Sequence, residues 1–282
     1  MTGPWPGRFS GGRPGLTWPR AWCGLWTLSG EEWAEVSHIH LPDGILPLWL
    51  VLLGWAATAL AVAAVLWYLR RNPAELSGRI ARLGVVAAVM MVGMSLEVVP
   101  IAYHFNLSVL AGILLGPAAG FLAAFLVVLM LALFGHGGIT VVGLNALVIG
   151  TEVVLGSLLF RAVSGARRLN LLWGAFIATV VALAVSTTLM VGIIGIARIN
   201  PAEQAPRAAI TFSNPFQEGL FRVELLKEEG HEPAELDLPT FAGVVYTLGI
   251  VGWALEGLLT GLIVRYLGQV RPDLLPVRRT AP

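Results

Sequence analysis

Five histidines are the side chains best suited to chemistry in this sequence, and four of them flank long apolar segments: His38, His40, His104 and His136, with His231 in an acidic stretch. Imidazole is the commonest side-chain ligand of Ni, Cu, Zn and Co ions. The single cysteine offers no thiolate pair, and no HExxH or CxxC spacing supports a zinc hydrolase or a zinc finger. A lone histidine at a helix end is more often a solvated polar residue than a ligand. The histidines therefore leave two interpretations open, a metal site and a polar rim.

Three acidic residues, Glu97, Glu152 and Glu256, fall inside apolar segments long enough to cross a membrane. An ionisable group at that depth is costly and is a functional-site hypothesis by default. The structural alternative is a protonated glutamate hydrogen-bonded between helices, which the absence of Lys and Arg from these segments favours. Helical spacing would put Glu97 and His104, seven residues apart, on one face about 10 Å apart along the axis. Asn145 and Glu152 share the same spacing.

Composition indicates the class of protein that must position these side chains. The chain is 56% apolar and only 12% charged, with a mean hydropathy of +0.78, whereas soluble domains carry about 25% charged residues. The net charge of +1 comes without a basic patch, so nucleic acid is not an expected partner. The single lysine, Lys227, is followed by Glu228, so no Walker A loop exists and the chain cannot hydrolyse ATP by that route.

The apolar segments predict an all-α, polytopic membrane bundle of about six to seven helical segments. A spanning helix needs about 20 mostly apolar residues; the sequence offers 47–68, 83–103, 141–162, 171–197 and 241–267. The stretch 105–134 is interrupted by Gly116 and Pro117, and proline breaks a helix, so two pieces are expected there. Small-residue pairs that permit close helix contact occur at Gly112/Gly116 and Gly257/Gly261.

Charges in the loops predict the orientation. Loops 69–82 and 161–170 and the C-terminal tail are arginine-rich, which places them in the cytoplasm by the positive-inside rule, while the acidic 198–240 loop lies outside. The N-terminus is then outside and the C-terminus cytoplasmic. Segment 105–134 must return to the side it left, as a hairpin with its tip near Gly116–Pro117 and a short or re-entrant first limb near 105–116.

Four blocks of the sequence resemble the CbiM/NikM family, the substrate-binding (S) membrane components of cobalt/nickel energy-coupling-factor (ECF) transporters. SHIHLPDGIL at 37–46 resembles the MHIPDGFL-like start of that family, and HFNLSVLAGILLGP at 104–117 keeps its His thirteen residues before a proline. LFGHGGITVVGLN at 133–145 is similar to an LFGDGGLTALGAN-like string. ALEGLLTGLIVRYLGQVRPDLL at 254–275 is similar to the family's closing helix and tail. The blocks occur in order over about 240 residues.

The resemblance implies capture of Ni²⁺ or Co²⁺ from outside, as a transported substrate with no permanent cofactor. It implies a transmembrane coupling (T) subunit, cytoplasmic ATPase (A) subunits, and in some systems a small accessory membrane subunit, in a prokaryotic cytoplasmic membrane. In the family, the N-terminal amine, the next amide and two imidazoles hold the metal in a near-plane of nitrogens, which suits Ni(II). By alignment those imidazoles are His40 and His104. Asp43 and Asn145 match the family and are expected to orient the N-terminal loop; a turn role before Gly44 is equally open for Asp43.

Departures from the family pattern leave the site partly open. Ile39 stands where the initiating Met is usual, so residues 1–36 are expected to be disordered or a mis-annotated extension. A true start at Val36, read as Met and then removed, would expose Ser37 and make His38 the second residue. The metal-binding domain is then 37–275, with a tail at 276–282. Glu97 and His136 differ from the usual family residues and could alter hydrogen bonding around the ligands. A stand-alone proton-coupled transporter or channel using Glu97, Glu152 and Glu256 is the alternative function. An intramembrane enzyme is disfavoured because the sequence has no recognisable nucleophile–base pair.

Overall fold

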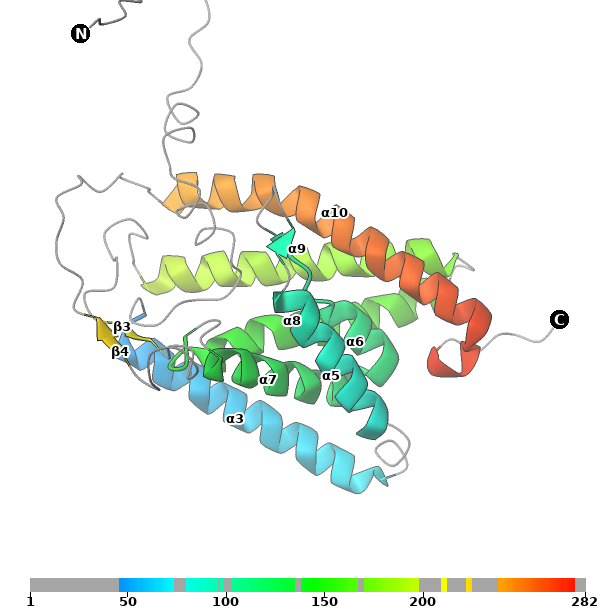
Figure 1. The fold of residues 1–282 in the computed structure, drawn as a ribbon, viewed down its shortest axis with the longest axis horizontal. Coiled ribbons are helices and arrows are strands. Elements are labelled where there is room, and N and C mark those ends of the chain that lie inside the picture. The colour runs from blue at the N-terminus through cyan, green and yellow to red at the C-terminus, as the bar shows by residue number, and fades with distance from the viewer. Residues whose placement is uncertain are drawn as a thin grey trace, which may run out of the picture.

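The computed structural model describes most of the chain between Leu46 and Pro276, namely residues 46–73, 80–95, 97–98, 103–134, 138–166, 170–197, 209–211, 222–224 and 238–276. These residues form a helical bundle (Figure 1). Its α-helices are α3 (Leu48–Arg71), α5 (Ile80–Ser95), α6 (Ser108–Leu115), α7 (Pro117–Leu133), α8 (Val142–Ala166), α9 (Leu171–Ala197) and α10 (Leu238–Val270), followed by the 3-10 helix η1 (Pro272–Leu274). Two short antiparallel ladders pair β1 (Glu97–Val98) with β2 (Tyr103–His104) and β3 (Ala209–Thr211) with β4 (Arg222–Glu224).

Four of these helices, α3, α8, α9 and α10, are long and apolar enough to cross a membrane. They follow the predicted spans 47–68, 141–162, 171–197 and 241–267 to within a few residues at each end. The prediction of an all-α, polytopic membrane bundle is therefore confirmed. Helices α5 and α7 are apolar but shorter.

Helix α8 lies at the centre of the bundle, where it packs against α3, α6, α7 and α9, while α10 packs mainly on α9. In Figure 1 the blue α3 and the orange-red α10 form opposite edges of the bundle. Helix α3 is the most peripheral, with only Leu50, Gly54, Thr58 and Leu69 buried. A bilayer solvates such an apolar outer face, so exposed leucines and tryptophans on α3 are not a packing fault here.

The break between α6 and α7 occurs at Gly116, as predicted. Gly116 has φ 80° and ψ 170°, a backbone conformation open to glycine alone at little cost. Pro117 follows at the first position of α7, where its missing N–H has no helical partner to lose. The two helices pack on each other, and α6, with eight residues, is only about 12 Å long. The predicted short limb is thus confirmed.

The second predicted span, 83–103, is wrong at its C-terminal end. Helix α5 ends at Ser95, and Glu97 lies in β1, paired in register with His104 of β2. Glu97 is therefore not inside a helical span, and Glu97 and His104 do not share a helix face two turns apart. The reason is Pro100, whose ring would clash with the carbonyl of residue 96 in a continuous helix.

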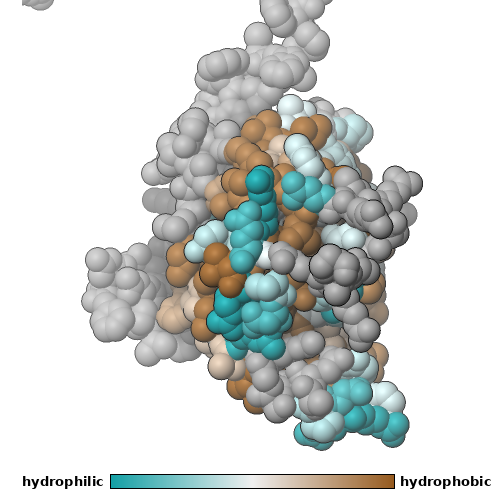
Figure 2. All heavy atoms as spheres, turned by 90° about the vertical axis from the view of Figure 1, so that its right-hand side faces the viewer, coloured by the Kyte–Doolittle hydropathy of each residue, from teal (hydrophilic) through white to brown (hydrophobic). Residues whose placement is uncertain are grey.

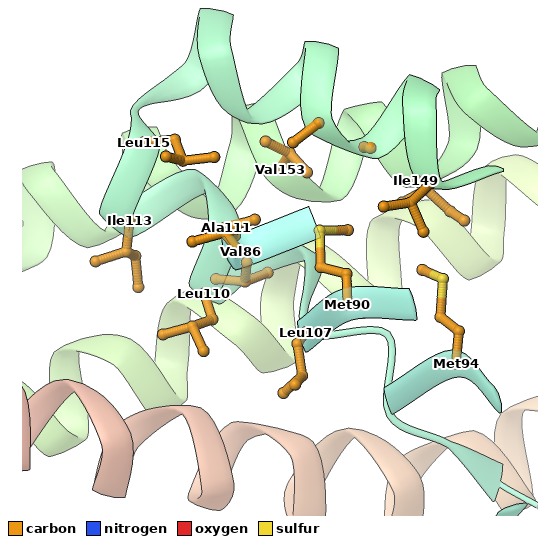
Figure 3. Close-up of a cluster of buried hydrophobic side chains, with 14 of the residues drawn as sticks. Val86, Met90, Met94, Leu107, Leu110, Ala111, Ile113, Leu115, Ile149 and Val153 are labelled. Carbon is orange, nitrogen blue, oxygen red and sulfur yellow. The ribbon is translucent and has the colours of Figure 1, made fainter. Parts of the chain in front are cut away.

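The hydrophobic core lies where α5, α6, α7 and α8 meet. Figure 3 shows Met90 of α5 and Leu107, just before α6, among side chains of α6 and α8 such as Ile113 and Val153. Glycines allow close packing around it: a Cβ at Gly112 would meet the carbonyl oxygen of Val153 on α8, and one at Gly261 would lie 2.7 Å from the carbonyl oxygen of Leu172 on α9. The predicted close contacts at Gly112 and at Gly257/Gly261 are confirmed.

Hydrophilic side chains gather at the end of the bundle where α3 and α10 finish, within a largely hydrophobic surface (Figure 2). Arg71 stacks on Trp67 at this end, 4.1 Å from the ring centroid. Arg271 donates two hydrogen bonds to Asp273, each 3.0 Å long. The helix termini that flank the arginine-rich loops lie at this end of the bundle, which agrees with the segregation of charge predicted from the sequence. The assignment of this end to the cytoplasm stays a prediction.

Candidate metal-capture site

The candidate site is organised around the turn Asn106–Ser108, hereafter the 106–108 turn, which joins β2 to α6. Leu107 adopts a left-handed conformation, with φ 51° and ψ 23°, although it is not a glycine. Such a conformation is unfavourable for a residue with a Cβ and persists only where surrounding contacts impose it. Within the turn, the N–H of Ser108 donates to Oδ1 of Asn106 at 3.0 Å, a local bond of the kind that stabilises Asx-turns.

Glu152 on α8 is the main side-chain partner of this turn. Its Oε2 accepts hydrogen bonds from Nδ2 of Asn106 and from Oγ of Ser108, both at 2.6 Å. Its Oε1 interacts with Oγ of Ser186 on α9. Glu152 is fully buried, so one carboxyl group joins the turn to two long helices inside the bundle.

Glu256 on α10 holds the same turn from another side. Its Oε1 accepts a hydrogen bond from the backbone N–H of Leu107 at 2.9 Å. Glu256 is also fully buried. Two of the three acids predicted within spans therefore converge on adjacent residues of one turn, from helices α8 and α10.

The 106–108 turn lies at the level of the middle of the bundle. Glu152 is ten residues beyond the start of α8, which corresponds to about 15 Å along the helix axis. Irregular backbone is tolerated at such depth only where protein covers it and satisfies its polar groups. Asn106, Leu107 and Ser108 are all buried, and the two carboxyl groups bind the N–H and side-chain donors. Helix α6 starts at mid-depth and has only eight residues. It therefore spans part of the bundle and does not cross it.

His104 is the predicted ligand that the structure describes. It lies in β2, two residues before Asn106, and is partly exposed. Its backbone pairs with that of Glu97, while Gly93 of α5 approaches the following residue so closely that a Cβ there would lie 2.5 Å from the carbonyl oxygen of Phe105. The 106–108 turn and α5 thus fix the chain on which His104 is carried.

The segment that follows the first histidine motif is attached to the start of α8. Trp55 of α3 donates through Nε1 to the carbonyl oxygen of Thr140 at 2.7 Å, and Thr58 donates through Oγ1 to that of Gly143 at 2.5 Å. Leu46 and Leu50 pack with residues of the α8 start and of the end of α9, namely Val141, Leu144, Met190 and Ile194. Asn145, the fourth residue of α8, is buried directly after these contacts.

Four predicted site residues, His38, His40, Asp43 and His136, lie outside the described residues, as does most of the acidic 198–240 loop. Within the described part of the chain, no group of three or more His, Cys, Asp or Glu residues is placed to hold a metal ion. The described residues thus supply His104 and its supporting turn. A set of three or more such ligands would therefore include residues outside the described ranges.

Sequence reasoning missed three partners of the buried acids: Asn106, Ser108 and Ser186. A signal for the first two was present, because both are polar residues directly after His104, ahead of an apolar run. Ser186 is one of four hydroxyl residues in α9, with Thr179, Thr187 and Thr188, and polar side chains inside spans commonly hydrogen-bond across helices. Neither signal identifies Glu152 as the shared partner.

Comparisons with known proteins identify the family to which this sequence is similar. A family model described as CbiM, cobalt uptake substrate-specific transmembrane region, matches residues 40–274. A candidate metal transport protein of Haloquadratum walsbyi is 30% identical over 243 residues, covering 84% of this chain and 93% of that protein. A candidate fused nickel transport protein, NikMN, of Archaeoglobus fulgidus is 29% identical over 250 residues, covering 86% of this chain and 70% of that protein.

Solved structures share the fold. A truncated transition metal transporter superposes with a TM-score of 0.62 at 19% identity, covering 82% of this chain and 99% of that one. A second transition metal transporter superposes with a TM-score of 0.61 at the same identity, covering 93% of its chain. At this identity the likeness concerns the arrangement of helices.

Proposed function

Because the chain belongs to the CbiM family of cobalt uptake substrate-specific transmembrane regions, we propose that it is the substrate-binding subunit of an ATP-driven ECF importer. It is a multi-pass membrane protein of the metal-transport class. In the proposed role it captures Ni²⁺ or Co²⁺ outside a prokaryotic cytoplasmic membrane and delivers it to the cytoplasm. The observation that carries the proposal is the family match from His40 to Leu274, which contains His104 and both buried acids.

The proposed ligands are nitrogen atoms. His104 supplies one imidazole, and His40 or His38 supplies the other, together with a free N-terminal amine and the following backbone amide. Four nitrogens in a plane suit Ni(II), and Cu(II) competes because it binds such a set more tightly. Asp43, Asn145 and His136 are proposed to orient the loops that carry these ligands.

The proposed partners supply the energy. A transmembrane coupling subunit and cytoplasmic ATPases would drive transport, since the sequence has no Walker A loop. A small accessory membrane subunit is a further proposed partner. The Archaeoglobus relative, whose name describes it as a fused protein, is longer than the matched region, which covers 70% of it.

A stand-alone proton-coupled transporter is the second candidate. The observation that favours it is the convergence of Glu152 and Glu256 on one buried turn, since intramembrane carboxyl groups often serve as proton relays. Glu97 does not support this role as first predicted, because it lies outside the helical spans.

Uptake of radioactive ⁶³Ni²⁺ and ⁵⁷Co²⁺ by cells separates the two candidates. We expect accumulation when the protein is expressed with coupling and ATPase subunits, and loss when the ATPase carries an inactive Walker A lysine. Accumulation that needs no ATPase and collapses with a protonophore would favour the proton-coupled candidate instead.

The ligand set is tested by metal titration of purified protein begun at Met1 and at Val36, each with and without His104→Ala. We expect square-planar Ni(II) absorption only in the shorter form, lost with His104→Ala. Equal binding by both forms would remove the free amine from the ligand set.

A further inference from the structure

We propose that Glu152 and Glu256 are positioning residues of the metal site, which place His104 by holding the 106–108 turn, and that Glu152 does so as an uncharged carboxylic acid. This inference rests on the proposed function. It adds a role for two residues whose hydrogen bonds run to the turn and to Ser186: both oxygens of Glu152 and Oε1 of Glu256 have partners there.

The backbone of Leu107 requires an external restraint. A left-handed residue with a side chain is disfavoured in isolation, and the N–H of Leu107 points to Oε1 of Glu256 instead of to a neighbouring backbone oxygen. A buried N–H without an acceptor is costly. By accepting a hydrogen bond from the N–H of Leu107, Glu256 stabilises the left-handed conformation inside the bundle. The direction in which the chain leaves β2, and therefore the place of His104, depends on that conformation.

The hydroxyl of Ser186 indicates the charge state of Glu152. Oγ of Ser186 lies within hydrogen-bond distance of two oxygens, Oε1 of Glu152 and the carbonyl of Leu183 at 3.2 Å. A serine hydroxyl has one proton and two acceptor lone pairs. Both contacts are satisfied when the carboxylic acid donates from Oε1 to Ser186, and Ser186 donates to Leu183. Oε2 then remains free to accept from Asn106 and Ser108.

The surrounding charges agree with an uncharged acid. The described basic residues on the helices of the two acids, Arg161 on α8 and Arg265 on α10, each lie nine residues further along, which is about 13 Å along the axis. The other titratable groups close to the turn are Glu256 and, two residues before Asn106, His104. Two ionised carboxylates bound to neighbouring residues of one buried turn would repel each other, which favours the uncharged form of one of them.

Loss of the turn is expected to weaken metal capture without removing a ligand. Groups that orient a ligating histidine commonly change metal affinity by about 10–100-fold when they are removed. Glutamine keeps an oxygen acceptor for Asn106 and Ser108 and an N–H donor for Ser186, so it reproduces the uncharged acid. Leucine has a similar size but neither group.

The test uses Ni(II) titration and the Ni(II) absorption spectrum of the full bundle, in whichever form binds in the experiment above. We expect Glu152→Gln and Glu256→Gln to bind like the parent, and Glu152→Leu and Glu256→Leu to bind about 10–100-fold more weakly with an altered spectrum. Ser157→Ala is the matched control, because Ser157 is a buried α8 residue whose hydroxyl meets no hydrogen-bond partner among the described residues. It is expected to leave affinity and spectrum unchanged.

A second measurement does not depend on metal. Hydrogen–deuterium exchange of a peptide covering residues 104–112 reports the Leu107 amide, and we expect faster exchange in Glu256→Leu than in Glu256→Gln. Parent-like exchange and Ni(II) binding in both Leu variants would overturn the positioning role and leave the proposed function intact. Loss of Ni(II) binding in Glu152→Gln, a variant that needs no hydrophobic replacement, would overturn the uncharged assignment. Absence of Ni(II) and Co(II) binding by the parent protein would overturn the proposed function and this inference together.

Discussion

The carboxyl group of Glu256, in the middle of α10, accepts a hydrogen bond from the backbone N–H of Leu107, 149 residues earlier in the chain. This contact connects the last long helix to the turn that follows His104. Glu152 of α8 binds the residues on both sides of Leu107. Two acids that could be taken for ion ligands thus act on the backbone and side chains of a turn that begins two residues beyond the predicted metal ligand.

The conformation of Leu107 predicts an unusual order of substitutions. Both Leu107→Ala and Leu107→Gly remove a buried side chain, at a cost of about 2–5 kcal/mol. Alanine keeps the left-handed penalty of about 1–2 kcal/mol, so we expect Leu107→Gly to be the more stable of the two. Thermal unfolding of the purified protein in detergent measures the difference.

Leu110, a buried residue within α6 three residues after Leu107, is the matched control. There glycine is expected to be worse than alanine by about 0.5–1 kcal/mol, as in any helix interior. The same order at both positions would show that the left-handed conformation of Leu107 carries no cost.

Close packing of α6 on α8 predicts a sharp difference between two glycines. A Cβ at Gly112 would meet the backbone of Val153, whereas one at Gly192 on α9 has nothing within 4 Å. We expect Gly112→Ala to destabilise the fold by about 1–3 kcal/mol through overpacking. Gly192→Ala is expected to be neutral or slightly stabilising, and equal unfolding temperatures for the two variants would contradict the close approach.

Nitrogen ligation predicts a pH dependence of metal capture. Imidazole, amine and amide nitrogens must lose protons before they bind Ni(II), so binding releases protons and affinity rises with pH. We expect isothermal titration in two buffers of different ionisation enthalpy to report proton release near neutral pH. A proton count of zero would point to ligands that are already deprotonated, such as carboxylates.

The ion pair after α10 is expected to matter little for stability. Hydrogen bonds from the Arg271 guanidinium lower the pKa of Asp273, and Asp273 raises that of Arg271. A lowered carboxyl pKa adds stability above the unfolded-state pKa and loses it as pH falls through the folded-state value. Because both groups are fully solvent-exposed, we expect Asp273→Asn to leave the unfolding temperature unchanged at neutral pH. A clear drop would mean that this pair holds η1 against the bundle.

The sequence by itself determined the position of four long helices, whereas the helix predicted over 83–103 ends at Ser95. Segment 171–197 is uniformly apolar and became α9 over the same residues. The interruption at Gly116–Pro117 followed from backbone chemistry that is local to two residues. Such features depend on neighbours in the sequence and on the thickness of a bilayer, so they can be predicted without the fold.

Only the tertiary structure decided how the polar residues are used. Spacing placed Glu97 and His104 on one helix face, whereas the chain leaves the helix after Ser95 and pairs the two residues in a ladder. The 106–108 turn depends on carboxyl groups from α8 and α10, and no local pattern predicts which distant oxygen will accept the N–H of Leu107. A buried polar group takes whatever partner the packing of the helices brings within 3 Å, and that packing is a property of the whole bundle.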